Sequence, residues 1–299
     1  MDGGFHVEIG SLFQGGELVR EVQPRINLSY LLLGSWRAKA SFGRFTQRML
    51  TVGNEDDVIS IFDAWIRVPK ELPVQHADHF VLGLAGHITE QASLNLEGYY
   101  KRYGSLVVYN RDKIDALDPD YIQGSGNSYG VELMLRSRSS LADLYGAYTL
   151  SWARIDNRGF VYFPRFDRRH HLNVMAVVHP MEGLNATLRW EYGSGFPFSQ
   201  TVGYFDRLSL DEALPGRFEL EIGSPYTMLG PKNAARLSAY HRLDFSVVYD
   251  FTLLGLEVSA GADVLNVYDN KNIFYFDRKT GQRVDMLYFY PSATLTIQY

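Results

Sequence analysis

The sequence predicts an all-β, antiparallel transmembrane β-barrel, with about twelve strands in this chain. The clearest signal lies in residues 127–152, where Tyr129, Val131 and Leu133 share one parity and Glu132 takes the other. Successive strand side chains point to opposite faces, so the segment makes one apolar and one mostly polar face. No stretch approaches the ~20 apolar residues of a transmembrane helix. Short and long connections also alternate along the chain, and together these features favour a barrel that crosses a membrane with strands.

Strand candidates recur along the whole chain, mostly ~9–13 residues long, which is near the length that a tilted membrane strand needs. In chain order they are 5–13, 25–33, 36–45, 79–88, 93–103, the two strands within 127–152, then 171–178, 185–192, 242–251, 256–264 and 288–299. Several are joined by turns of a few residues, such as Gly34-Ser35 and Leu253-Leu254-Gly255. The pattern therefore predicts consecutive antiparallel hairpins.

The other connections are long and are predicted to lie on the opposite side of the membrane. They span residues 47–78, 104–126, 153–169, 193–240 and 266–287. Bacterial outer-membrane barrels have short periplasmic turns and long extracellular loops, so the asymmetry assigns the two sides. A soluble β-sandwich, the competing interpretation, has shorter strands and more similar loops at its two ends.

The alternation also separates a lipid face from a lumen face. Leu243, Phe245 and Val247 share one face, whereas Arg242 and Asp244 lie on the other. Charged side chains in lipid would cost several kcal/mol, so we expect them to face the lumen. Aromatic residues near strand ends are typical of the girdles of such barrels, and the candidates are Tyr30, Trp36, Phe42, Tyr100, Trp152, Trp190 and Tyr249.

Composition excludes several classes of function. The 299 residues contain no cysteine, which removes disulfides and cysteine-based metal sites. The net charge of −5 leaves no basic footprint, so nucleic acid is not an expected partner. The N-terminus, MDGGFHVEIGSL, lacks a basic segment followed by an apolar one, so no signal peptide is recognised. We therefore expect either a trimmed chain or the C-terminal part of a longer protein.

Several stretches carry motifs whose order and spacing are more specific than any one of them. They are QPRINLSY at 23–30, AKASFGRFTQ at 38–47, QHADHFVLGL at 75–84, LEGYYKRY at 96–103, GVEL at 130–133, FPRFDRRHHLN at 163–173, RLSAYHRLD at 236–244 and VLNVYDNKN at 264–272. In this order they resemble the β-barrel of TonB-dependent outer-membrane receptors. Ser238 stands where that family usually has proline.

The resemblance implies a fold and a role. It implies that residues 1–299 form the C-terminal portion of a barrel of about twenty-two strands, with no plug domain in this sequence. It implies the bacterial outer membrane, contact with its lipid, and coupling to the TonB system through the plug. The implied function is uptake of a scarce, bulky ligand such as a siderophore, cobalamin, glycan or peptide, without catalysis and without a cofactor. The final alternating strand, ending at Tyr299, resembles the signal that barrel-assembly machinery recognises.

Three polar clusters are candidate sites. His170 and His171 follow Asp167-Arg168-Arg169, but adjacent strand residues point to opposite faces, so we expect a polar strand entry with Asp167 pairing to arginines rather than a metal site. The loop with Asp112, Asp115, Asp118 and Asp120 lacks the glycine and terminal glutamate of a calcium loop, so we expect a solvated loop. Glu55-Asp56-Asp57 is interpreted in the same way. No nucleophile motif or phosphate loop is present.

The loops 47–78, 104–126, 155–168 and 193–240 are the expected ligand surface. The candidate residues are Trp65, Tyr109, Tyr121, Phe160, Tyr162, Phe196, Phe198, Tyr204 and Phe205. The sequence leaves two other functions open. The chain could be a small plugless porin-like channel, which would conduct ions alone, or an outer-membrane enzyme, which would need a nucleophile or acid–base group gathered at one rim.

Overall fold

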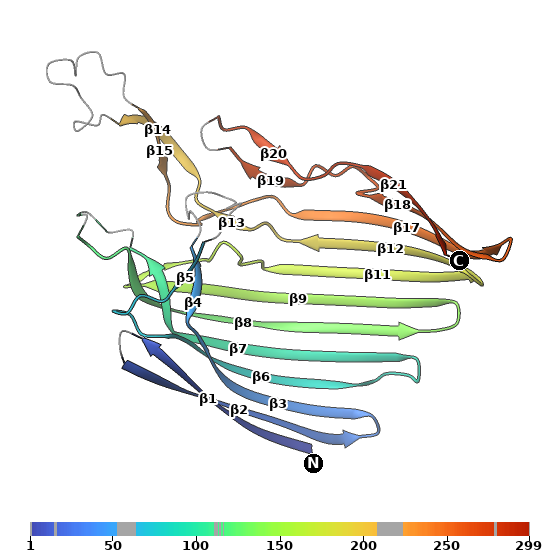
Figure 1. Cartoon of the computed structure of the whole chain (residues 1–299), viewed down its shortest axis with the longest axis horizontal. Helices are drawn as coiled ribbons and strands as arrows, with labels where there is room; N and C mark the ends of the chain where they lie inside the picture. Colours follow the sequence, from blue (N-terminus) through green and yellow to red (C-terminus); the bar gives the residue numbers. More distant parts are fainter. Residues whose placement is uncertain are drawn as a thin grey trace.

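The computed structural model describes residues 2–14, 17–52, 64–110, 113, 115, 117–207, 224–277 and 280–298. These residues form one large antiparallel sheet and four small two-stranded sheets (Figure 1). In the large sheet, twelve strands follow one path and a thirteenth, β10, pairs with β9. No helix in the described ranges is long and apolar enough to span a membrane.

The long strands pair with one another in the order in which they occur in the sequence. Its members are β1 (Asp2–Gln14), β2 (Glu17–Leu33), β3 (Trp36–Gln47), β6 (Gln75–His87), β7 (Ala92–Tyr109), β8 (Tyr121–Arg138), β9 (Ala142–Asn157), β11 (His170–Met181), β12 (Leu184–Gly193), β17 (Tyr240–Leu253), β18 (Leu256–Leu265) and β21 (Tyr290–Gln298). The shorter strands are β4 (Met49–Val52), β5 (Ala64–Arg67), β10 (Phe160–Tyr162), β13 (Pro197–Phe198), β14 (Thr201–Arg207), β15 (Ser224–Leu229), β16 (Ala235–Arg236), β19 (Ile273–Phe276) and β20 (Arg283–Asp285). All twelve long strands coincide with strands expected from the alternation.

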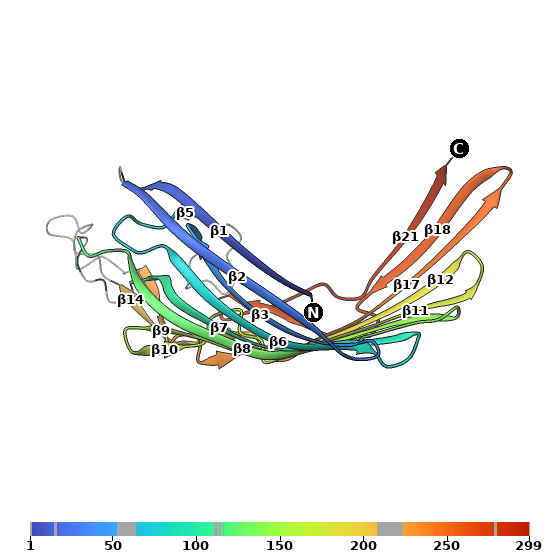
Figure 2. The same ribbon diagram turned by 90° about the horizontal axis from the view of Figure 1, so that it is seen from below.

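The sheet curves into an open trough (Figure 2). Its edges are β1 and β21, which do not pair with each other in the described part of the chain. Pro291, which has no N–H to donate, lies on the edge strand β21 opposite Val264, a position at which proline is tolerated. The described sheet is thus a section of a barrel wall rather than a closed twelve-stranded barrel.

The two faces of the sheet differ as the alternation predicts. On β8, Ser128 and Gly130 are buried, whereas Tyr129 and Val131 are 37% and 45% exposed. Side chains crowd together on the inside of a curved sheet and are therefore less exposed there. The residues that alternate in step with Ser128 thus face the hollow of the trough, and those in step with Val131 face outward. The register extends this assignment across the sheet, because Val131 lies opposite Gly98 and Leu150.

Charged residues gather on the concave face. Lys39 Nζ lies 3.7 Å from Glu97 Oε1, and Asn95 links the two by hydrogen bonds to both. Further along the same face, Arg242 donates two hydrogen bonds to Asp244, at 3.0 and 2.8 Å. At these positions the charges lie inward as expected, and they pair between β3 and β7 and along β17.

Turns gather at the end of the sheet where the connections are short. The hairpin from β17 to β18 places Leu254 and Gly255 at φ 53° and 82°, the two left-handed positions of a tight hairpin turn. In the hairpin from β11 to β12, Gly183 has φ 77°, and a Cβ there would lie 2.2 Å from the carbonyl oxygen of Asp250. Only glycine can be accommodated at position 183, because the backbone of β17 lies so close to this turn.

The long connections contain more structure than predicted. The expected loop 104–126 is mostly strand, because β7 continues to Tyr109 and β8 starts at Tyr121. The extension is held by Val108 and Ile122, which lie opposite each other and are 7% and 3% exposed. Gly104, Gly124 and Gly126 interrupt the apolar alternation, so the sequence pattern did not predict that the two strands continue through these positions.

Other connections fold into the small sheets. β4 pairs with β5, β13 with β16, β14 with β15, and β19 with β20. Residues 53–63 and 208–223 lie outside the described residues, and so do Glu55-Asp56-Asp57 and Asp112. The small sheets rise from the end of the trough opposite the short turns (Figure 1).

Candidate ligand-binding cleft

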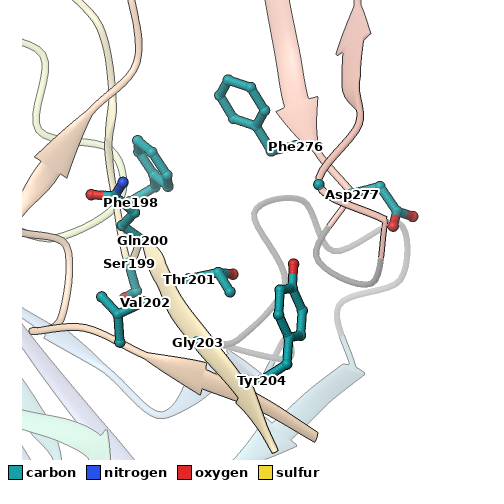
Figure 3. Close-up of a pocket in the computed structure, with 10 residues that line it drawn as sticks. Phe198, Ser199, Gln200, Thr201, Val202, Gly203, Tyr204, Phe276 and Asp277 are labelled. Atoms are coloured by element: carbon teal, nitrogen blue, oxygen red, sulfur yellow. The ribbon is translucent and has the colours of Figure 1, made fainter. Parts of the chain in front are cut away.

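A cleft opens between two of the small sheets beyond the rim of the trough. It has a volume of 420 Å³, and its walls come from residues 198–204, at the β13–β14 junction, and from the end of β19. Figure 3 shows Phe198 and Thr201 on one side and Phe276 and Asp277 on the other, with Tyr204 at the end of the β14 wall. Segments about seventy residues apart therefore build one concavity.

Three aromatic residues, Phe198, Tyr204 and Phe276, line the cleft. The rings of Phe198 and Phe276 face each other with centroids 6.1 Å apart and planes 26° apart. Gln200 and Thr201 add amide and hydroxyl groups along the same wall. Such a surface suits a ligand with flat apolar parts and hydrogen-bonding groups, because rings favour stacking and the polar groups fix orientation.

The wall from β13 is held in place by buried hydrogen bonds. Ser199 is 5% exposed, and its Oγ accepts a hydrogen bond from the backbone N–H of Asn233 at 3.1 Å. Asn233 Nδ2 in turn donates to the carbonyl oxygen of Phe163 at 2.7 Å. The cleft wall is thereby connected to the segment that precedes β11.

The opposite wall is shaped by a turn. Oδ1 of Asp277 accepts hydrogen bonds from both the backbone N–H and the hydroxyl of Thr280, each at 2.8 Å. The N–H of Asp277 donates to the carbonyl of Gln282 at 2.8 Å, which closes the β19–β20 hairpin. The carboxylate of Asp277 therefore stabilises the turn that positions Phe276 at the end of β19.

Asp167 anchors the base of this region to the barrel wall. Its side chain is completely buried, and Oδ1 accepts a hydrogen bond from the backbone N–H of Ala153 in β9 at 2.7 Å. Oδ2 pairs with Arg236 and, at 3.5 Å, with Arg169. Arg236 belongs to β16, which pairs with β13. The expected pairing of Asp167 with arginines is confirmed.

Arg168 makes a second connection on the other side of the same motif. Its guanidinium carbon lies 4.2 Å from the centroid of Phe196 and 5.7 Å from that of Tyr240. Burial lowers the pKa of Arg168, and the nearby carboxylate of Glu191 opposes that effect. A Cβ at Gly193 would lie 2.6 Å from the guanidinium carbon, so a larger residue there would displace the Arg168 side chain.

The two histidines of the motif face apart, as expected. His170 Nδ1 lies 2.8 Å from the hydroxyl of Tyr148 on the convex face. His171 Nε2 lies 3.1 Å from Glu191 on the concave face. No group of three or more potential metal ligands occurs in the described ranges. In the acidic loop, Asp115 N–H donates to Asp118 Oδ2 at 3.0 Å, an arrangement typical of a solvated turn.

The predicted ligand residues do not form a single cluster. Phe198 and Tyr204 line the cleft, Phe196 stacks on Arg168 at its base, and Phe205 follows Tyr204 on β14 without lining the cleft. Two others, Tyr109 and Tyr121, pack against each other at the tip of the β7–β8 hairpin, with centroids 6.2 Å apart.

The remaining three predicted residues lie elsewhere. Tyr162 is 7% exposed beneath Lys232, which makes it a core residue of the rim, while Phe160 packs 5.9 Å from it. Trp65 lies on β5 and is 66% exposed. Phe276, Thr201 and Ser199 also line the cleft, but they were not among the residues predicted from the sequence. For Phe276 the only available signal was its place in the long connection 266–287.

Comparison with known proteins gives the family. A family model described as the TonB dependent receptor-like β-barrel matches residues 10–267. A search of curated proteins found no match. This chain also resembles solved structures of receptors, with sequence identities low enough that they establish the fold alone.

Three of these structures illustrate the likeness. The ferric-catecholate import receptor of K12 E. coli is 13% identical, with a TM-score of 0.58 over 94% of this chain and 34% of that one. The ferric preacinetobactin receptor of Acinetobacter baumannii is 11% identical, with a TM-score of 0.60 over 95% and 37%. The pyoverdine outer membrane receptor of Pseudomonas aeruginosa is 13% identical, with a TM-score of 0.62 over 94% and 37%.

The chain spans about a third of the length of these receptors. Its twelve-stranded sheet corresponds to part of their barrel, and the family is one of transport rather than catalysis. The family match, over residues 10–267, agrees with the convex apolar face and the loop asymmetry. The chain belongs to the TonB-dependent receptor family and forms part of its outer-membrane β-barrel.

Proposed function

We propose that residues 1–299 supply the C-terminal part of the barrel of a receptor that takes up a scarce, bulky ligand across the outer membrane. The cleft between Phe198 and Phe276 is the observation that carries this proposal. It lies at the end of the sheet with long connections, which is the extracellular side in such barrels. Its 420 Å³ falls within the range of small-molecule sites.

An iron chelate is the ligand class that the cleft fits best. The solved relatives are receptors for a ferric catecholate, for pyoverdine and for ferric preacinetobactin, according to their names. Facing rings beside hydroxyl and amide groups suit a ligand that combines flat aromatic parts with polar chelating groups. Cobalamin, a glycan and a peptide are the other outcomes that the experiment distinguishes.

The concave face suggests how passage is controlled. Paired charges such as Lys39–Glu97 and Arg242–Asp244 line it. We propose that a plug domain occupies this hollow against these groups, and that the TonB system pulls on the plug to release the ligand. The chemistry is then binding and conformational gating.

Uptake in the producing bacterium tests this proposal. Cells lacking the receptor should lose accumulation of one labelled class among ferric chelates, cobalamin, glycans and peptides, and cells lacking TonB should lose the same class. Restoring the receptor should restore it. If deletion changes no uptake, or if uptake persists without TonB, the transport proposal is wrong. Ion conductance by the chain alone would favour the porin-like channel instead.

A further inference from the structure

An unbroken row of aromatic residues crosses five strands on the convex face. The register places these residues directly opposite one another from β3 to β9: Phe42, Phe80, Tyr100, Tyr129 and Trp152. Neighbouring rings lie close, with centroids 5.0 Å apart for Phe42 and Phe80 and 5.3 Å apart for Tyr129 and Trp152. Aromatic side chains prefer the level at which the lipid chains meet the headgroups, so this row marks that level on the extracellular side.

The next row outward on the same face is charged. Two residues further along each strand lie, in order, Arg44, Asp78, Arg102, Asn127 and Arg154. Arg44 pairs with Asp78, at 2.6 and 2.8 Å, so these two charges compensate each other. Arg102 and Arg154 are exposed and carry the excess positive charge. They are two strands apart, which separates their backbones by about 10 Å.

A third arginine joins this row from the segment before β11. Arg169 stacks on Trp152, with its guanidinium carbon 4.8 Å from a ring centroid. Arg154, Arg169 and Arg236 all lie within 6.0 Å of the ring centroid of Phe163. The carboxylate of Asp167 pairs with two of them, and Nη1 of Arg169 is buried without an acceptor in the described part of the chain.

We propose that Arg102, Arg154 and Arg169 form a docking surface for the phosphorylated headgroups of outer-leaflet lipid. Arg102 and Arg154 lie on the lipid-facing parity one row beyond the aromatic level, where lipid phosphates lie, and Arg169 stacks on Trp152 of the aromatic row. A guanidinium presents several donors in a planar fork that matches phosphate oxygens. An anion here also offsets the repulsion among three like charges around one phenyl ring. Clusters of basic residues at this level recognise anionic headgroups.

Lipid binding by the receptor extracted from its own outer membrane tests the proposal. The probes are an acylated glucosamine disaccharide with two phosphates, the same glycolipid without phosphates, and inorganic phosphate. Bound lipid phosphate and the midpoint of thermal unfolding are measured for the native protein and for the double variant R102Q/R154Q. Arg138→Gln is the matched control, because Arg138 is exposed at the opposite end of β8.

The phosphorylated glycolipid should stabilise the native receptor, and the double variant should bind it about thirtyfold more weakly, with Arg138→Gln unchanged. Both variants should keep the compact, heat-resistant form, since each replaces an exposed side chain. Equal binding by the double variant, or equal stabilisation by the glycolipid without phosphates, would overturn the proposal. Stabilisation by inorganic phosphate at the same concentration would also overturn it, in favour of a free-anion site. Ligand uptake is not measured, so failure of the transport proposal leaves this test intact.

Discussion

Arg236 donates to Asp167 twice, to the buried carboxylate and, at 3.0 Å, to its backbone oxygen, although the two residues are 69 positions apart. The same guanidinium donates to the carbonyl of Gly195 at 3.2 Å. One side chain thus connects the entry of β11 to both strands of the β13–β16 pair. Because β13 continues into the cleft wall, the position of Phe198 depends on this ion pair.

Replacing Asp167 by Asn should destabilise the receptor by about 2 kcal/mol, below the value for a fully buried pair because Arg236 is 30% exposed. The amide keeps the shape of the side chain but leaves Arg169 and Arg236 without a counter-charge. The loss should appear as a lower midpoint for disappearance of the folded band on heating in detergent. Asp120→Asn is the control, since its partner Lys113 lies in an exposed pair. Equal midpoints for the two variants would show that the anchor has no stabilising role.

Truncating the facing rings should weaken ligand binding without changing the fold. Phe198→Ala and Phe276→Ala each remove one side of the 6.1 Å ring pair, and we expect an affinity loss of about tenfold for each. Phe205→Ala is the matched control, because Phe205 is 43% exposed on the same strand as Tyr204 but does not line the cleft. Affinity is measured as half-saturation of labelled ligand on whole cells. A loss for Phe205→Ala as large as for Phe276→Ala would place the ligand elsewhere.

The strands could be predicted from the sequence, whereas the cleft could not. Period-two alternation is a local signal, and it located β17 and β18 to within about two residues of their bounds. The cleft depends on which loops fold back on each other. Nothing local to Phe276 indicates that it faces Phe198, because that contact is set by the β13–β16 and β19–β20 pairs. The pairing of Asp167 with arginines was predictable from FDRRH, but not the identity of Arg236 as its main partner.

Replacing a turn glycine by alanine should destabilise the protein more where the glycine contacts a neighbouring strand than where it faces open space. Gly183 and Gly255 have similar φ values, 77° and 82°, and both close short hairpins. A Cβ at Gly183 would meet Asp250 O at 2.2 Å, whereas a Cβ at Gly255 meets nothing within 4 Å. We expect Gly255→Ala to cost about 1 kcal/mol from backbone strain and Gly183→Ala about 1–3 kcal/mol more. Heating midpoints of the two variants check the difference, and equal losses would mean that β17 shifts freely away from Gly183.

The assignment of the two faces can be tested with a single charge placed on either side of one strand. Val131 and Met134 are both on β8 and are 45% and 49% exposed, but Val131 faces outward and Met134 faces the hollow. Arginine at position 131 should cost about 1–2 kcal/mol, because it removes a charge from water one row inside the aromatic level, whereas arginine at 134 joins a polar surface. Val131→Arg should therefore reduce the fraction of folded, heat-resistant receptor in the outer membrane, and Met134→Arg should leave it near the native level. The reverse order would mean that the charged face contacts lipid.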